Sequence, residues 1–309
     1  MRVATIYRDR WYSGLSLERQ GPSSESAQFG HGLLASMGIT EDHYPIEEIQ
    51  PGQAMRFDHT ADVDAVFILP CEEVYPWVRK TFPNAKVIVW MCDDDWRFQT
   101  FGRFWMAHAD VIATTSRSAL LKYQAAGYKG AFLTNWAARR EWGQYSSGSK
   151  LCSANFQGLL YGDRAKILTR ISRDYPIASQ DWRDDLLSER NYFLAMDSCR
   201  YSLCLTQSSA GVRQMKGRLF EPQILGTVLV TEDVPGLSEY WIPGEECIVF
   251  TEPEEAAEAM RVLDRDPVRR EKIAAAAKSR LLKEHTFDAR LRDLFAFAGV
   301  EVAVPTKGA

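Results

Sequence analysis

Short apolar runs alternate with segments of helical spacing along most of this 309-residue chain. The first of these runs, at residues 3–7, is typical of a buried strand. Strands that alternate with helices indicate βαβ units and a parallel sheet. In the first half of the chain, strands are predicted at residues 3–7, 63–69, 85–91, 111–114 and 131–134, and helices at residues 25–37 and 116–126.

A second series of the same kind follows residues 143–150, a polar segment rich in Gly and Ser. We therefore expect one α/β domain at residues 1–150, a second at 151–285, and a C-terminal helix with a tail at 286–309 that packs back on the first domain. Ligands of such sheets bind outside the carboxyl ends of the strands. The second series has predicted strands at residues 153–160, 201–206 and 227–231, and predicted helices at 163–172, 191–197 and 218–225, the last ending at Gly226.

Two further helices are predicted from the residues at their N-termini. Thr251 and Glu254 have the spacing of a capping box, and they predict a helix that continues to Leu263. Asp266 followed by Pro267 predicts the start of the next helix, because proline is favoured at the first helical position.

Composition limits the classes of function. The chain has 37 Lys and Arg against 41 Asp and Glu, so its formal net charge is −4 and no broad basic face for nucleic acid is expected. The six cysteines form no CxxC pair, which favours buried thiols in a reducing compartment over a disulfide framework or a zinc site. Because no apolar run has the length of a signal peptide or a membrane span, the expected location is the cytoplasm.

A basic cluster precedes a predicted helix in the second half. Arg213, Lys216 and Arg218 lie before or within the start of this helix, and Glu221 lies on its first turn. Clustered cations and a helix N-terminus both favour phosphate, and a carboxylate can accept two hydrogen bonds from a ribose diol. The alternative is a solvated basic turn whose carboxylate balances the helix dipole.

An acidic cluster, Asp93-Asp94-Asp95, directly follows the third predicted strand. Adjacent carboxylates repel one another unless they are paired, metal-bound or well solvated. Three interpretations are open: Asp93 or Asp94 contacts substrate and acts as a base; the acids stabilise a helix N-terminus; or Asp93 and Asp95 hold Mg²⁺ or Mn²⁺ on a diphosphate.

Further motifs occur in a characteristic order. The second half contains Arg218-x-Phe220-Glu221, Gly226, Thr231-Glu232, Pro235-Gly236-Leu237 with Glu239, Pro243-Gly244-Glu245-Glu246, Asp266-Pro267, Arg270, His285-Thr286 and Arg290. The first half contains Trp90-x-x-Asp93-Asp94, Ala109-Asp110-Val111, Tyr123 and Gly127. In order and spacing these motifs resemble group 1 glycosyltransferases of the GT-B type, in the spore-maturation glycosyltransferase-like (CgeB-like) branch.

The resemblance implies an α/β GT-B fold, in which two Rossmann-like domains face a central cleft. The first domain would take the acceptor, and the second would bind a nucleoside diphosphate sugar. It also implies a glycosyltransferase that needs no metal and no cofactor besides the donor substrate. The acceptor class stays open among glycan, protein, metabolite and modified nucleobase.

The resemblance also assigns donor-side roles. Glu221 would hold the ribose hydroxyls, Arg164 would bind the pyrophosphate, and Lys216 and Arg218 would add further phosphate contacts. Many retaining relatives carry a glutamate eight residues before the one matched by Glu221, and here that position is Arg213. Arg213 is therefore expected on the donor side, with the reaction stereochemistry open.

On the acceptor side, Asp93 and Asp94 are the catalytic candidates, and Arg8, Asp9, Arg10 and Trp11 would contact the acceptor. Two alternatives remain. One is a GT-B-like binding protein that has lost catalysis, for which Arg213 is the support. The other is a metal-dependent GT-A-like transferase that uses Asp93 and Asp95.

Overall fold

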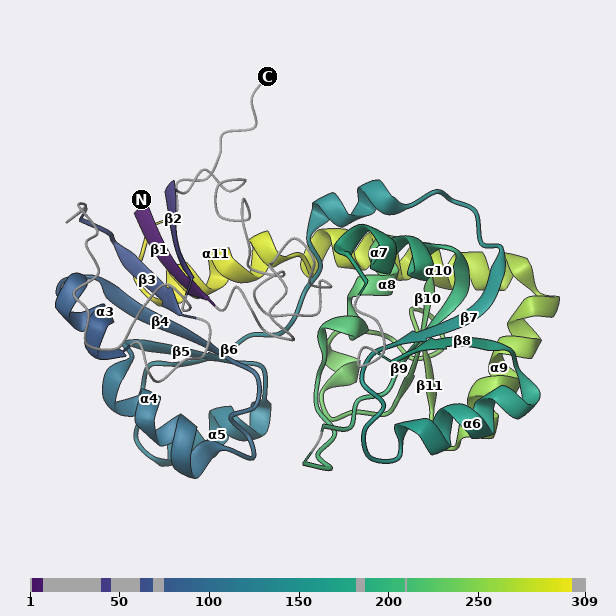
Figure 1. Cartoon of the computed structure of the whole chain (residues 1–309), viewed down its shortest axis with the longest axis horizontal. Coiled ribbons are helices and arrows are strands. Elements are labelled where there is room, and N and C mark those ends of the chain that lie inside the picture. The colour runs from purple at the N-terminus through teal and green to yellow at the C-terminus, as the bar shows by residue number, and fades with distance from the viewer. Residues whose placement is uncertain are drawn as a thin grey trace, which may run out of the picture. The chain divides into compact units, whose positions relative to one another are not determined.

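The computed structural model describes residues 2–7, 40–45, 62–68, 75–181, 187–208 and 210–301. It divides the chain into two compact units (Figure 1). The first unit is Met1–Asn135 with Asp288–Ala309, and the second is Trp136–Phe287. The helix predicted at residues 25–37, the tail from residue 302, and Arg8, Asp9, Arg10 and Trp11 lie outside the described residues.

The first unit is built on a parallel sheet with the strand order β2-β1-β3-β4-β5-β6. The helices described in this unit are α3 (Tyr75–Thr81), α4 (Arg103–His108), α5 (Arg117–Ala125) and α11 (Phe287–Phe297), with a π-helical turn, η4, at Phe98–Gly102. The strands are β1 (Arg2–Tyr7), β2 (Thr40–Pro45), β3 (Ala65–Ile68), β4 (Lys86–Met91), β5 (Val111–Thr114) and β6 (Ala131–Leu133).

Helices cover both faces of this first sheet. Val66 and Ile68 of β3 pack in one core with Trp105 of α4 and with α5. The side chain between them, Phe67, points to the other face and contacts Phe295 of α11 at 6.5 Å between ring centroids. The sheet is therefore buried on both sides, which explains its nearly continuous apolar strands.

The second unit contains a parallel sheet with the order β11-β10-β9-β7-β8. Its strands are β7 (Cys152–Gln157), β8 (Ile177–Gln180), β9 (Cys199–Cys204), β10 (Val228–Glu232) and β11 (Ile248–Phe250). Its helices are α6 (Arg164–Asp174), α7 (Glu189–Asp197), α8 (Glu221–Ile224), α9 (Pro253–Arg265) and α10 (Pro267–Glu284), with 3₁₀ turns η5 (Arg140–Tyr145), η6 (Gly217–Leu219) and η7 (Leu237–Glu239).

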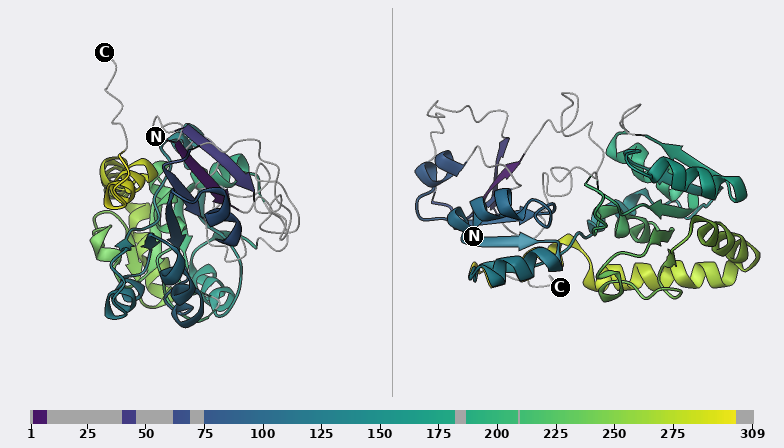
Figure 2. Two further views of the ribbon diagram at one scale, coloured as in Figure 1. Left: turned by 90° about the vertical axis from the view of Figure 1, so that its left-hand side faces the viewer. Right: turned by 90° about the horizontal axis from the view of Figure 1, so that it is seen from below.

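Alternating side chains of β7 show how this second sheet is covered. Ala154 and Phe156 belong to a core shared with α6 and α9, which lie side by side (Figures 1 and 2). Asn155 points the other way and donates to the carbonyl of Ala195 in α7. The edge where these strands end carries the candidate site, and the helices fix the loops there.

The predicted linker lies inside the second unit. Trp142, just ahead of the Gly- and Ser-rich stretch, is fully buried and packs against Phe193 and Phe287. Ser147 donates to Asp197 from both its backbone N–H and its hydroxyl. Residues 136–150 therefore pack with the second unit, and the chain changes unit after Asn135 instead of at residues 143–150.

One predicted helix start needs a correction of one residue. The capping box of α9 is made by Glu252 and Glu255, because Glu255 accepts the backbone N–H groups of Thr251 and Glu252. Thr251 and Glu254, which have the same spacing, do not form it. The start of α10 is as predicted, with Asp266 accepting from the backbone N–H of Arg269.

Among the described residues, no helix is both long enough and apolar enough to cross a membrane. Of the cysteines there, Cys199, Cys204 and Cys247 are buried, Cys92 is half-buried and Cys152 is exposed, all as free thiols.

Candidate functional site

The candidate site lies at the carboxyl edge of the second sheet. The strands are parallel, so Gln157, Cys204 and Glu232 end β7, β9 and β10 at the same edge. Arg164 begins the helix after β7, and the cluster from Arg213 to Glu221 follows β9. The topology therefore gathers all five expected donor-side residues on the loops of one edge.

Glu221 is the buried carboxyl group of this edge. Its side chain is fully buried at the start of α8, and Tyr192 of α7 donates a hydrogen bond to Oε2 at 2.5 Å. Burial raises the pKa of Glu221 to about 7, although the Tyr192 hydrogen bond and the Arg218 charge act in the opposite direction. The carboxyl group therefore changes its protonation state close to neutral pH.

Arg218 is almost fully buried, and its charge acts on Glu221. Its Nη1 donates to the carbonyl of Gln157, the last residue of β7. Gly158 follows, and a Cβ atom at this glycine would lie well inside contact distance of Arg218 Nη1. Arg218 can therefore take this position only if residue 158 is a glycine. Sequence reasoning missed this residue, for which the signal was a glycine directly after a strand.

Arg164 joins two loops of the edge. Its Nη1 donates to the carbonyl of Leu159 at 2.9 Å, and its Nη2 donates to the carbonyls of Leu205 at 2.9 Å and Gln207 at 2.7 Å. The guanidinium also stacks on Tyr161 at 4.0 Å. Burial, and then the nearby charge of Arg218, lower the pKa of Arg164 to about 10. The structure shows Arg164 as a clamp between the loops after β7 and β9.

Arg213 and Lys216 are nearer the surface than the other two cations. Arg213 is exposed, and it donates to the carbonyl of Asp233 at 3.3 Å, with Nη2 3.7 Å from Oε1 of Glu232. Lys216 is half-buried and directly precedes η6. Glu232 is buried and accepts from the backbone N–H of Thr206 at 2.7 Å. Where many retaining relatives have a glutamate, this chain places a cation against a carboxylate of the next strand end.

The N-terminus of α6 follows the loop after β7, at the same edge of the sheet. Its first flanking residue, Asp163, makes no side-chain capping hydrogen bond and pairs with Lys166 at 2.9 Å. The first N–H groups of a helix have no partner within the helix, and their dipoles favour an anion. This helix start, Lys216 and Arg213 together supply donors suited to a phosphate group.

The acidic cluster lies in the first unit, and its three carboxylates have different surroundings. Asp94 is fully buried and accepts from Thr114 at 3.0 Å, and burial raises its pKa to about 6. Asp95 accepts from Lys122 at 2.6 Å and Ser118 at 2.8 Å, and these hydrogen bonds outweigh partial burial and hold its pKa below the usual value. Asp93 is half-buried. Asp94 therefore points into the unit, and Asp95 is engaged with α5.

The part of the chain that the structure describes contains no group of three or more His, Cys, Asp or Glu side chains arranged to hold a metal ion. Asp95, one of the two ligands of the metal interpretation, is instead ion-paired with Lys122.

Comparisons with known proteins give one match to a family model and several to solved structures. Residues 155–296 match a family model described as glycosyl transferase-like. A search of curated protein sequences finds no match.

Solved structures also match this chain, some of them over nearly its whole length. HepE from Anabaena, in complex with UDP and glucose, is 10% identical with a TM-score of 0.62, covering 97% of each chain. Sucrose-phosphate synthase from Thermosynechococcus elongatus is 12% identical with a TM-score of 0.60, covering 96% of this chain and 99% of that one. TarM is 10% identical with a TM-score of 0.54 over 77% of this chain and 56% of that one.

These likenesses show the GT-B fold, as the sequence motifs predict. The alternative of a GT-A-like transferase is therefore wrong, because the chain has two parallel sheets of the GT-B arrangement. The narrower CgeB-like branch stays a prediction.

Proposed function

We propose that this GT-B chain, whose residues 155–296 match the glycosyl transferase-like family model, transfers a sugar from a nucleoside diphosphate sugar to an acceptor. The observation that carries the proposal is the grouping of a buried carboxyl group, Glu221, with cations and an uncapped helix start at one sheet edge. A ribose diol and a diphosphate need these two kinds of partner.

Glu221 holds the ribose in this proposal. Its ionised carboxylate accepts hydrogen bonds from the two ribose hydroxyls, and the Tyr192 hydroxyl fixes its orientation. Because the pKa of Glu221 is raised to about 7, donor affinity is expected to increase as the pH rises through neutrality.

The diphosphate lies against Lys216, Arg213 and the N-terminus of α6. These donors stabilise the negative charge that develops on the leaving diphosphate, which is the main catalytic need of a transferase that uses no metal. Arg218 and Arg164 are buried and contribute positive charge without touching the diphosphate in this proposal. Their hydrogen bonds to backbone carbonyls position the loops. HepE was crystallised with UDP-glucose, which supports a UDP sugar as the first donor to test.

On the acceptor side, Asp93 is the better candidate for the base. It is half-buried, whereas Asp94 is fully buried and accepts from Thr114. In this proposal Asp93 takes the acceptor proton, and Asp94 supports the strand end that carries it.

The activity is tested by incubating the protein with a panel of UDP, GDP and TDP sugars and measuring release of the nucleoside diphosphate, with and without EDTA. We expect release that EDTA does not reduce, and a loss of at least about tenfold in Lys216→Ala or Arg213→Ala. Lys272→Ala, which removes an exposed lysine of α10, is the matched control and should release diphosphate at the parent rate.

Two outcomes would favour other functions. Donor binding without release, over many acceptors, would support the inactive GT-B-like binding protein, for which Arg213 in place of a glutamate is the motivating observation. Loss of activity in EDTA would contradict metal independence.

A further inference from the structure

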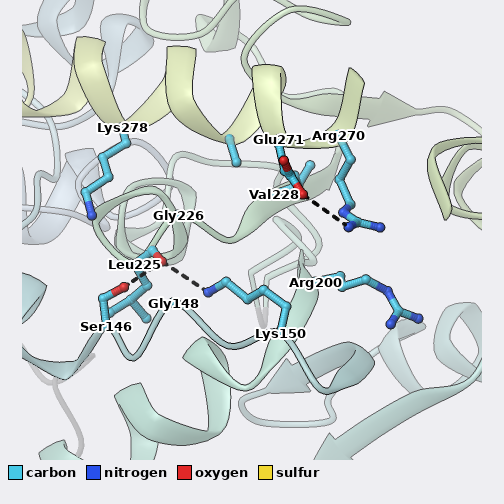
Figure 3. Close-up of a pocket in the computed structure, with 11 residues that line it drawn as sticks. Ser146, Gly148, Lys150, Arg200, Leu225, Gly226, Val228, Arg270, Glu271 and Lys278 are labelled. Carbon is cyan, nitrogen blue, oxygen red and sulfur yellow. Dashed lines mark hydrogen bonds and ion pairs between the residues drawn. The ribbon is translucent and has the colours of Figure 1, made fainter. Parts of the chain in front are cut away.

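A pocket of about 490 Å³ lies at the opposite edge of the second sheet (Figure 3). Arg200 and Val228, near the starts of β9 and β10, line it, together with residues 146–150 and one face of α10. Glu221 and the other donor-side residues follow the carboxyl ends of the strands. The pocket is therefore distinct from the proposed donor site.

Positive charge is concentrated in this pocket. Four cations line it, Lys150, Arg200, Arg270 and Lys278, together with the carboxylate of Glu271. Two carboxylates outside the lining neutralise part of this charge. Asp197 pairs with Lys150 at 2.8 Å, and Asp264 is shared between Arg200 at 3.0 Å and Arg270 at 3.4 Å.

Three carboxylates thus face four cations, and the balance is one positive charge. Within the described parts of the chain, no ion pair involves Lys278. Arg270 is held only loosely, at 3.4 Å from Asp264 and 3.9 Å from Glu271. Of the four cations, Lys278 and Arg270 would therefore give up the least ion pairing on binding a ligand.

The fold leaves room between these cations. Arg270, Ala274 and Lys278 are four residues apart on α10 and so share one face, where the small Ala274 separates the two long side chains. Figure 3 shows Arg270 and Lys278 extending from α10 toward the segments that carry Arg200 and Lys150. On that far side, Gly148 and Gly226 have φ angles of +74° and +69°, and the space where a side chain would begin is open.

One of these cations, Lys150, lies in an environment that disfavours its charge. Burial lowers the pKa of Lys150, and the charge of Lys278 lowers it further, against the effect of Asp197. A bound anion nearby would favour the charged form of Lys150. The pocket therefore carries an excess of positive charge and has space for a small anion.

We propose that this pocket binds a small phosphate-bearing anion. Lys150 Nζ already donates to Asp197, Leu225 and Thr227, so it contributes charge from a fixed position. The guanidinium groups of Arg200 and Arg270 and the ammonium group of Lys278 come from different elements, and such donors match the several terminal oxygens of a phosphate better than the two of a carboxylate. The volume is in the range of small-molecule sites, which leaves room for an organic group beyond the phosphate.

The proposal is tested by isothermal titration of the full chain with inorganic phosphate, pyrophosphate and glycerol 3-phosphate, each in the presence of saturating UDP. We expect binding of at least one of these anions that UDP does not displace, and a loss of about tenfold or more in the double variant Arg270→Ala/Lys278→Ala. The three anions distinguish a simple phosphate site from one that also requires a second phosphate or an ester group.

The matched control is Arg269→Ala/Lys272→Ala, which removes two exposed cations from the same helix without touching the pocket. It should bind as the parent does, and both double variants should keep the parent unfolding midpoint. The proposal is overturned if none of the three anions binds, if UDP displaces them, or if the control loses as much affinity as the pocket variant. Loss of UDP binding or of donor turnover would instead bear on the donor site.

Discussion

At the residue scale, two buried carboxyl groups are held where their protonation changes near physiological pH. Glu221 and Asp94 are both fully buried, and burial raises their pKa values to about 7 and about 6. Glu221 accepts a hydroxyl hydrogen bond from Tyr192, and Asp94 accepts one from Thr114. The difference lies in the surroundings: Glu221 is grouped with phosphate-attracting cations, whereas Asp94 is packed inside the first unit.

Replacing Glu221 by Gln should change the pH dependence of stability. The folded-state pKa is above the ordinary value of 4.5, so the folded protein keeps a proton that the unfolded chain releases between about pH 4.5 and about pH 7. The free energy of unfolding of the parent therefore falls across this window, by on the order of 3 kcal/mol. The variant Glu221→Gln should not lose this stability, because the glutamine side chain does not titrate.

Urea unfolding of both proteins at about pH 5 and about pH 8 measures the effect. The variant should gain stability relative to the parent as the pH rises. A difference that is the same at both pH values would show that the carboxyl group titrates normally.

Gly158→Ala should displace Arg218, because the added Cβ lies inside contact distance of Nη1. We expect a loss of roughly 1–3 kcal/mol from overpacking in addition to backbone strain, and weaker UDP binding. Gly244→Ala is the control: it has a φ of +82° with open space at the Cβ position, so it should lose only the backbone part. Equal losses in stability would mean that the contact with Arg218 is relieved at little cost.

At the scale of elements, the loops after β7 and β9 are fixed by one side chain. Arg164 donates to three backbone carbonyls, of Leu159, Leu205 and Gln207. The resemblance alone expects Arg164 on the pyrophosphate, whereas these contacts favour a role in positioning the loops that surround it.

Arg164→Ala should therefore reduce the free energy of unfolding by roughly 3–5 kcal/mol, because it leaves buried carbonyls without their charged donor. Lys166→Ala, on the exposed side of the same helix turn, should have almost no effect. Chemical denaturation and UDP titration separate the roles. If stability is unchanged while UDP affinity falls, Arg164 contacts phosphate directly and the positioning role is incorrect.

The predicted elements that the structure confirms are those with a strong local pattern. The strands β4, β5 and β10 lie within apolar runs, and Gly226 ends the segment before β10 with a φ of +69°. The edge strand β2 was missed because its sequence, TEDHYP, is mostly polar, as suits a strand at the edge of a sheet. The helix predicted at residues 218–225 is divided into η6 and α8, with Pro222 in the first turn of α8.

The candidate site could be predicted only in part, for a physical reason. The cluster from Arg213 to Glu221 is local, so its charges are visible in the sequence. The contacts that define it are long-range: Tyr192 is 29 residues from Glu221, and Gln157 is 61 residues from Arg218. No spacing rule connects such positions, because tertiary packing alone brings them together.

At the scale of the whole molecule, the chain forms two α/β units, each built on a parallel sheet. The likeness to HepE spans 97% of both chains. Since identity is 10%, the fold is retained while most side chains differ. Function must therefore be argued from the site, and the donor edge of the second unit is where the described residues support it best.

The central claim is that Glu221 and its neighbouring cations bind the nucleoside diphosphate of a sugar donor. The most direct measurement is the affinity for UDP at about pH 8, by isothermal titration, of the parent, Glu221→Gln and the control Glu245→Gln, which alters an exposed carboxylate of the same unit. We predict that Glu221→Gln weakens binding by about tenfold or more, and that Glu245→Gln binds as the parent does. Equal affinity of the parent and Glu221→Gln, or no UDP binding at all, would contradict the claim.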